Sequence, residues 1–246
     1  ELYNIRLYEH NVFEHLFNGS IGAPVIEKLQ NGAKVALEYP NSDFYGADIF
    51  TPKSYGNITF VECNIFERLP FPDEEFDYVY SRNGFHFFRN DTFQGFLSEI
   101  LRILKPGGWF EVTLTSKHVF DGGPAFSFWN SSWFWWFKSN NINTDFIIYL
   151  EDYLQKTQKI ECIEHQTVKI FMGNGNHEIG EFSGEVFLFL LKELKEILLP
   201  FIGISSTKYQ DLVKEIEIEF KSGKSKSYFY GHRIFGKKKD LEKLIY

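Results

Sequence analysis

A chain of 246 residues, 43% of them apolar, is long enough to bury the core of one large domain. Its net charge of −7 excludes broad binding to nucleic-acid phosphates, which requires a basic surface, so we expect no nucleic-acid partner. Cys63 and Cys162 are the only cysteines and lie far apart, which is typical of a reducing compartment and predicts an intracellular protein of the cytoplasm or nucleus.

The most apolar stretch, residues 182–203, carries too many charges to cross a membrane. A spanning helix needs roughly 18 or more residues with few or no charges. This stretch is interrupted by Glu185, Lys192, Glu193, Lys195 and Glu196. We therefore predict an amphipathic helix there and no membrane span. No metal site is predicted, and the oligomeric state stays open.

The first half of the chain begins with helical patterns and continues with strands. Helices are predicted at about 2–17 and 24–29, the second beginning at a proline, which suits a first helical turn. Three segments then show the alternation, or the β-branched and aromatic content, that is typical of strands. They are residues 43–48, 58–63 and 76–81.

A strong helix is predicted at 93–104, because its apolar side chains recur at i, i+3, i+4, i+7, i+8 and i+11. Asn90 and Asp91 precede it and could cap its first turn. The sequence Lys105-Pro106-Gly107-Gly108 should end it, since proline and glycine cannot continue a helix cheaply. A fourth strand is predicted at 109–114.

The second half opens with an aromatic insert at 126–137 that contains four tryptophans. Three interpretations of it stay open: a lid over a substrate cleft, packing in the core, or an interaction surface. The elements predicted after it are a helix at 145–158, a strand at 167–172, helices at 181–199 and 206–221, and a strand at 227–235. Lys237-Lys238-Lys239 should be a solvated tail. Neither a repeat nor a linker appears, so residues 1–246 should form one α/β domain.

Asp48 ends an apolar segment followed by turn residues, which places its carboxylate at the carboxyl edge of a predicted parallel strand. In open α/β sheets a nucleotide-like ligand binds at that edge, and such an Asp suits a ribose diol. A Gly-rich turn should precede it by about 20 residues. Residues 31–40 contain one glycine and no such loop. Half of a cofactor site is therefore present in the sequence.

Three motifs between residues 58 and 112 come in a telling order: Val61-Glu62-Cys63-Asn64, then 69–79 with Leu-Pro-Phe-Pro-Asp, then 104–111 with Lys-Pro-Gly-Gly. Together they resemble class I S-adenosylmethionine (SAM)-dependent methyltransferases. The flanks, 6–25 and 230–236 among them, are similar to fungal methyltransferase-domain proteins related to secondary-metabolism regulators. The resemblance divides the domain into a helical lead-in (1–40), a cofactor-side half (41–115) and a substrate-side half with the C-terminal tail (116–246).

The resemblance breaks between Val35 and Ala36, where family members carry the first strand, the Gly-rich loop and most of the first helix. A parallel crossover needs a dozen or more residues, and too few separate Val35 from Asp48. Residues 33–37 should therefore extend the preceding helix. The implied fold is α/β and Rossmann-like, a mostly parallel sheet with helices on both faces that lacks its central strand. The strands beside the gap should pair directly or gape.

By resemblance, Asp48 accepts hydrogen bonds from the ribose, and Asn64 faces the adenine amino group in place of the family's Asp. The full cofactor-binding set implied is Asp48, Ile49, Asn64, Ile65, Ser81 and Arg82. Phe66 could flank the adenine ring beside Ile65, although both could equally be core residues. His86 is a candidate general base at the acceptor side, against a packed histidine as the alternative.

The function implied is methyl transfer from SAM to an undetermined small-molecule or protein acceptor, impaired by loss of the Gly-rich loop. The alternative is a catalytically silent protein of the same fold that binds a partner. A nicotinamide-dependent oxidoreductase shares Asp48, but it explains neither the Leu-Pro-Phe-Pro-Asp motif nor Lys-Pro-Gly-Gly. It ranks behind both.

Overall fold

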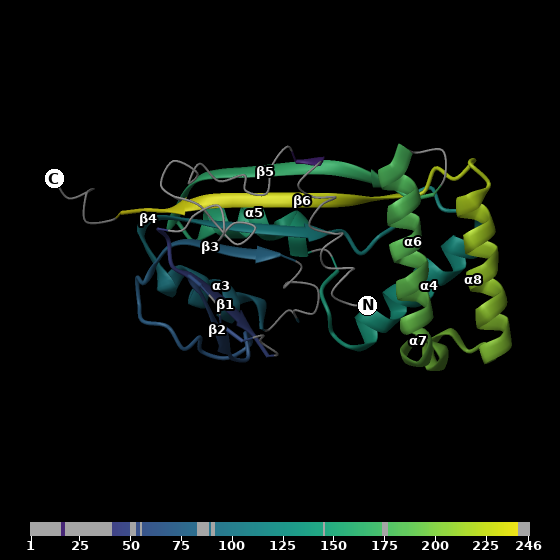
Figure 1. Ribbon diagram of the computed structural model, residues 1–246, viewed down its shortest axis with the longest axis horizontal. Coiled ribbons are helices and arrows are strands. Elements are labelled where there is room, and N and C mark those ends of the chain that lie inside the picture. Colours follow the sequence, from purple (N-terminus) through teal and green to yellow (C-terminus); the bar gives the residue numbers. More distant parts are fainter. Residues whose placement is uncertain are drawn as a thin grey trace. The chain divides into compact units, whose positions relative to one another are not determined.

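Figure 1 shows a computed structural model of the protein. It divides into two compact units, which are considered separately below. Unit 1 contains 1–20, 113–150 and 165–233, and unit 2 contains 21–112, 151–164 and 234–246. The residues described are 16–17, 41–49, 53–54, 56–82, 89, 92–144, 146–173 and 177–240. The expected helices at 2–17 and 24–29, the segment 33–37 and His86 fall outside them, apart from Leu16 and Phe17. The single domain and its three parts stay predictions.

Unit 2 contains a short parallel sheet formed by β1 (Phe44–Asp48) and β2 (Ile58–Glu62). The register runs from Phe44 opposite Ile58 to Asp48 opposite Glu62, so both predicted strands are confirmed. Gly46 is needed in β1 because a Cβ there would lie 2.6 Å from the ring of Phe60. The ring of Phe60 therefore packs directly on the β1 backbone.

A second sheet has the order β3-β4-β6-β5. Its strands are β3 (Phe76–Arg82), β4 (Leu104–Thr115), β5 (Ile160–Phe171) and β6 (Tyr228–Lys238). Within the described part of the chain, β1 and β3 lie in separate sheets and do not pair. Ring contacts join them instead: Tyr45 lies 5.6 Å from Phe76 and 6.0 Å from Phe71, centroid to centroid. Aromatic edges thus pack where a strand pair is absent.

The predicted helix before β4 is confirmed as α3 (Phe93–Ile103), and its apolar stripe is buried. It ends one residue before the expected boundary, and β4 already begins at Leu104. The residues Lys-Pro-Gly-Gly consequently lie within β4, which is longer than the predicted strand at 109–114. Gly107 has a φ of +76°, which favours glycine, and a Cβ at Gly108 would lie 3.0 Å from Asp77 O.

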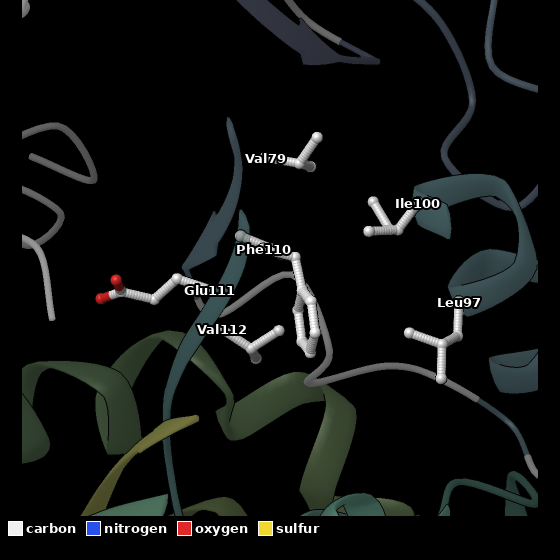
Figure 2. A pocket seen from close by; sticks show the side chains of 7 residues that line it. Val79, Leu97, Ile100, Phe110, Glu111 and Val112 are labelled. Carbon is white, nitrogen blue, oxygen red and sulfur yellow. The ribbon is translucent and has the colours of Figure 1, made fainter. Parts of the chain in front are cut away.

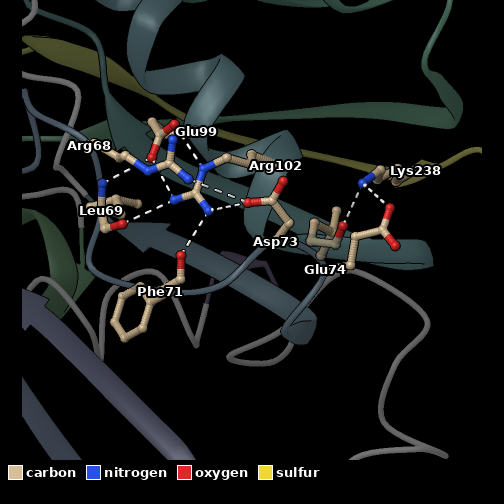
Figure 3. Close-up of polar contacts among 9 residues, drawn as sticks. Arg68, Leu69, Phe71, Asp73, Glu74, Glu99, Arg102 and Lys238 are labelled. Carbon is tan, nitrogen blue, oxygen red and sulfur yellow. Dashed lines mark hydrogen bonds and ion pairs between the residues drawn. The ribbon is translucent and has the colours of Figure 1, made fainter.

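Arg102, in the last turn of α3, binds the proline-rich segment that leads into β3 (Figure 3). Its guanidinium donates to Phe71 O at 2.7 Å and to Leu69 O at 3.0 Å. The same group pairs with Glu99 at 2.7 Å and Asp73 at 2.8 Å. Glu99 in turn accepts from Leu69 N at 2.9 Å. The hydrogen bond from Arg102 lowers the pKa of Glu99, so this carboxylate stays ionised at neutral pH.

Lys238 shows that the expectation of a solvated lysine tail is wrong at that position. Its ammonium donates to Leu104 O, the C-cap of α3, at 2.7 Å and pairs with Glu74 at 3.4 Å (Figure 3). A cation at a helix C-terminus is stabilised by the carbonyl groups there. Lys237 pairs with Glu161 at 3.5 Å. The strand β6 extends through both lysines, which the sequence run alone did not indicate.

Unit 1 contains a helical core built from α4 (Pro124–Ser139), α6 (His177–Glu193), α7 (Lys195–Ile202) and α8 (Ser206–Lys221). The predicted helix at 181–199 is two helices, which meet at Leu194. α5 (Phe146–Lys156) confirms the helix predicted at 145–158. The strand predicted at 167–172 begins seven residues earlier, at Ile160.

The aromatic insert is the helix α4, and its tryptophans divide between interior and surface. Trp129 is 2% exposed and stacks on Trp133 at 5.5 Å, and Trp133 stacks on Trp136 at 5.2 Å. Trp135 is 63% exposed. One face of α4 therefore packs in the core, which was one of the three interpretations of the insert, while Trp135 lies on its outer face.

We expect Arg102→Ala to destabilise the protein by about 2–4 kcal/mol, because it removes hydrogen bonds to two carbonyls, takes the paired cation from Glu99 and leaves Asp73 only the exposed Arg68. Urea unfolding followed by circular dichroism measures the change. Arg68→Ala is the matched control, since Arg68 is 74% exposed and pairs with the same Asp73 at 3.6 Å. It should cost no more than about 0.5 kcal/mol. Equal effects of the two variants would contradict the role given to Arg102.

Candidate functional site

The carboxyl ends of β1 and β2 meet at one edge of their sheet, because the two strands are parallel and in register. Asp48 Oδ1 accepts from Ile49 N at 2.7 Å, and Asp48 O accepts from Cys63 N at 2.9 Å. Asp48 is exposed to solvent, and Ile49 is 51% exposed. The structure thus brings Asp48 and Ile49 to the segment that contains Asn64 and Ile65.

Asn64 begins a tight turn that uses its side-chain amide. Its Nδ2 donates to Glu67 Oε1 at 2.9 Å, and its Oδ1 accepts from Phe66 N at 3.0 Å. An amide oxygen has two lone pairs, so Oδ1 retains one acceptor position. Phe66 is 48% exposed beside it, whereas Ile65 is half-buried. The edge therefore offers an acceptor together with exposed apolar surface.

Cys63 is a functional-site neighbour that the sequence reasoning did not single out. Its thiol is half-buried, and burial followed by the negative charge of Asp48 raises its pKa. Because the thiolate is the nucleophilic form, this cysteine is poorly suited to attack at neutral pH. Its position directly before Asn64 at a strand end was the available signal.

Ser81 and Arg82 end β3 and therefore belong to the other sheet. Both are half-buried. The structure brings together four of the six predicted cofactor residues and places these two on a different sheet. His86, the candidate general base, lies outside the described residues.

A small pocket lies between β3, β4 and α3 in unit 2, and Figure 2 shows its lining side chains. Apolar groups and one hydroxyl face it from Val79, Ser81, Leu97, Ile100, Phe110 and Val112. In Figure 2 the carboxylate of Glu111 points away from α3, and Tyr78 donates to it at 3.0 Å. Its cavity volume of about 10 Å³ is barely enough for one water molecule and far below the roughly 300–1,000 Å³ of typical ligand sites. This pocket is a gap in core packing.

Comparison with known proteins relates the chain to methyltransferases. A family model described as a methyltransferase domain matches residues 34–112. Among solved structures, loganic acid methyltransferase with S-adenosylhomocysteine has a TM-score of 0.53 at 10% identity, with 96% of this chain and 94% of that one covered. A putative methyltransferase from Bacillus halodurans has a TM-score of 0.46 at 18% identity, with 86% and 90% covered. Comparison with curated proteins gave no match.

A phosphoethanolamine N-methyltransferase 2 from Haemonchus contortus, in complex with phosphomonomethylethanolamine and S-adenosylhomocysteine, has a TM-score of 0.49 at 17% identity. It covers 93% of this chain, but the chain spans only 56% of that protein's length, and 39% in a second structure of it. The whole-length likeness above a TM-score of 0.5 shows the α/β fold of methyltransferases. The domain match relates residues 34–112 to methyltransferase domains. Among the described residues, every helix is too short or too polar to span a bilayer.

We expect Cys162 to react with a thiol reagent several-fold faster than Cys63 at pH 8. Cys162 is exposed, whereas burial and Asp48 keep the thiol of Cys63 protonated. Asp48→Asn removes the charge and should speed the labelling of Cys63 while leaving Cys162 unchanged. Mass spectrometry of the labelled peptides measures both rates. A Cys63 rate that does not respond to Asp48→Asn would contradict the proximity of the two side chains.

Proposed function

We propose that the chain binds SAM at the carboxyl edge of β1 and β2 and transfers its methyl group, with affinity weakened by the lack of a Gly-rich loop. The observation that carries this proposal is the position of Asp48 at a parallel strand end, inside the segment that matches a methyltransferase domain. The kinship with fungal regulator-related proteins and an intracellular location belong to the same proposal.

The nucleoside end of SAM has suitable partners at this edge. Asp48 accepts hydrogen bonds from the two ribose hydroxyls, which a carboxylate at a strand end is placed to do. Asn64 Oδ1 accepts from the adenine amino group with its second lone pair. Ile49 and Phe66 supply exposed apolar surface for the purine faces. These four residues are the nucleoside partners in the proposal.

The methionine end lacks its usual partner. In the family, backbone N–H groups of the Gly-rich loop approach this end, and residues 31–40 contain no such loop. A loss of about 4 kcal/mol would lower affinity roughly a thousandfold. Ser81 and Arg82 at the end of β3, and His86 after it, are proposed to face the cofactor and the acceptor. The acceptor, a small molecule or a protein side chain, stays open.

A catalytically silent, partner-binding protein is the second candidate. The observation that favours it is the outer face of α4, where Trp135 is 63% and Phe128 48% exposed. Large exposed aromatic side chains are enriched where proteins bind one another. Incorporation of a labelled methyl group from SAM into any acceptor would exclude the silent alternative.

We expect SAM and methylthioadenosine to bind with affinities within a few-fold of each other, because only the nucleoside end is held. Isothermal titration calorimetry with both ligands measures this. Asp48→Asn should weaken both by about 10–100-fold, the loss of a charged hydrogen bond. Asp43→Asn, an equal change of charge at an exposed position just before β1, should leave both unchanged. Absence of heat with millimolar SAM would overturn the proposal.

A further inference from the structure

Two histidines face one another on neighbouring strands of unit 1. His165 Nε2 lies 3.0 Å from His232 Nδ1. The strands β5 and β6 run antiparallel, since Met172 N donates to Ser227 O at one end and Lys239 N donates to Lys159 O at the other. This register holds the two imidazoles side by side.

The ring of His232 is neutral at neutral pH, which keeps a nitrogen lone pair on it. His232 is 8% exposed, and burial followed by the charge of His165 lowers its pKa to about 4. His165 is half-buried, so solvent reaches the pair from its side. Neighbouring groups include Thr167 on β5 and Tyr230 on β6.

The separation of the two nitrogens suits coordination of one ion. Two nitrogens bound to a metal at the usual distance of roughly 2.0–2.1 Å lie about 2.8–3.4 Å apart for angles between square and tetrahedral. The observed 3.0 Å falls in this range. Thr167 Oγ1 lies 3.5 Å from each nitrogen, close enough to hydrogen-bond a coordinated water.

We propose that His165 and His232 chelate one divalent transition-metal ion of the imidazole-preferring class, Zn²⁺ or Cu²⁺, with water in the remaining positions. The described residues contain no group of three or more His, Cys, Asp or Glu side chains that could hold a metal. Within the described part of the chain, two side chains are therefore the whole ligand set, so we expect weak, exchangeable binding. The proton now shared between the rings moves to the outer nitrogen of its donor, so both inner lone pairs bind the ion without a redox change.

The test titrates the full chain with Cu²⁺ alone and with Zn²⁺ alone, followed by calorimetry. One equivalent should bind, Cu²⁺ more tightly than Zn²⁺ as the Irving–Williams order requires. His165→Asn and His232→Asn should each weaken that site at least about 10-fold, since even loss of an outer-shell partner costs 10–100-fold. His118→Asn is the matched control, because its ring lies against Phe120 and Phe134 in the same unit. It should bind like the wild-type chain.

Two results would overturn the metal site: no binding to the wild-type chain, or equal binding by the wild-type chain and both variants. Circular dichroism checks that each variant is folded. Should His232→Asn unfold, histidine NMR of the wild-type chain decides the question. Two ring signals must shift together on Zn²⁺ addition, and in His165→Asn neither may do so. This inference is independent of the proposed function, and SAM binding by His165→Asn should equal that of the wild-type chain.

Discussion

The guanidinium of Arg102 is the interaction on which the order of unit 2 depends. Leu69 and Phe71 each precede a proline, so the segment between β2 and β3 cannot pair its backbone in a regular ladder. The planar guanidinium of Arg102 binds this backbone instead, because its N–H groups reach both carbonyls and two carboxylates at once. The start of β3 is thereby fixed to the end of α3, and Lys238 binds the same helix end from β6.

Much of the fold could be predicted where a local pattern decides the structure. The apolar stripe of α3 specifies its buried face, and the β-branched and aromatic content of β1 to β3 indicates strands, in each case from a few neighbouring residues. Patterns failed where the partner is distant in sequence. The first residues of β5 pair near the end of β6, as the bond between Lys239 and Lys159 shows, and nothing near Ile160 indicates it.

In the candidate site, too, some features could be predicted from the sequence and others could not. Asp48 and Asn64 could be placed together because parallel strands end at a common edge, whatever their side chains do. The turn that occupies the amide of Asn64, and the effect of Asp48 on Cys63, depend on side-chain geometry. The spacing of residues in the sequence does not predict these side-chain contacts. For Arg102, the sequence showed only an unremarkable cation in a helical last turn.

The parallel pair β1–β2 has a consequence for dynamics. Five residues on each strand, in a sheet that has only two strands among the described residues, make a marginally stable element. Its amide protons should exchange with deuterated solvent sooner than those of β4, whose side chains are largely buried. A molecule that settles across the strand ends would slow that exchange. Ligand capture and local folding would then be one coupled event.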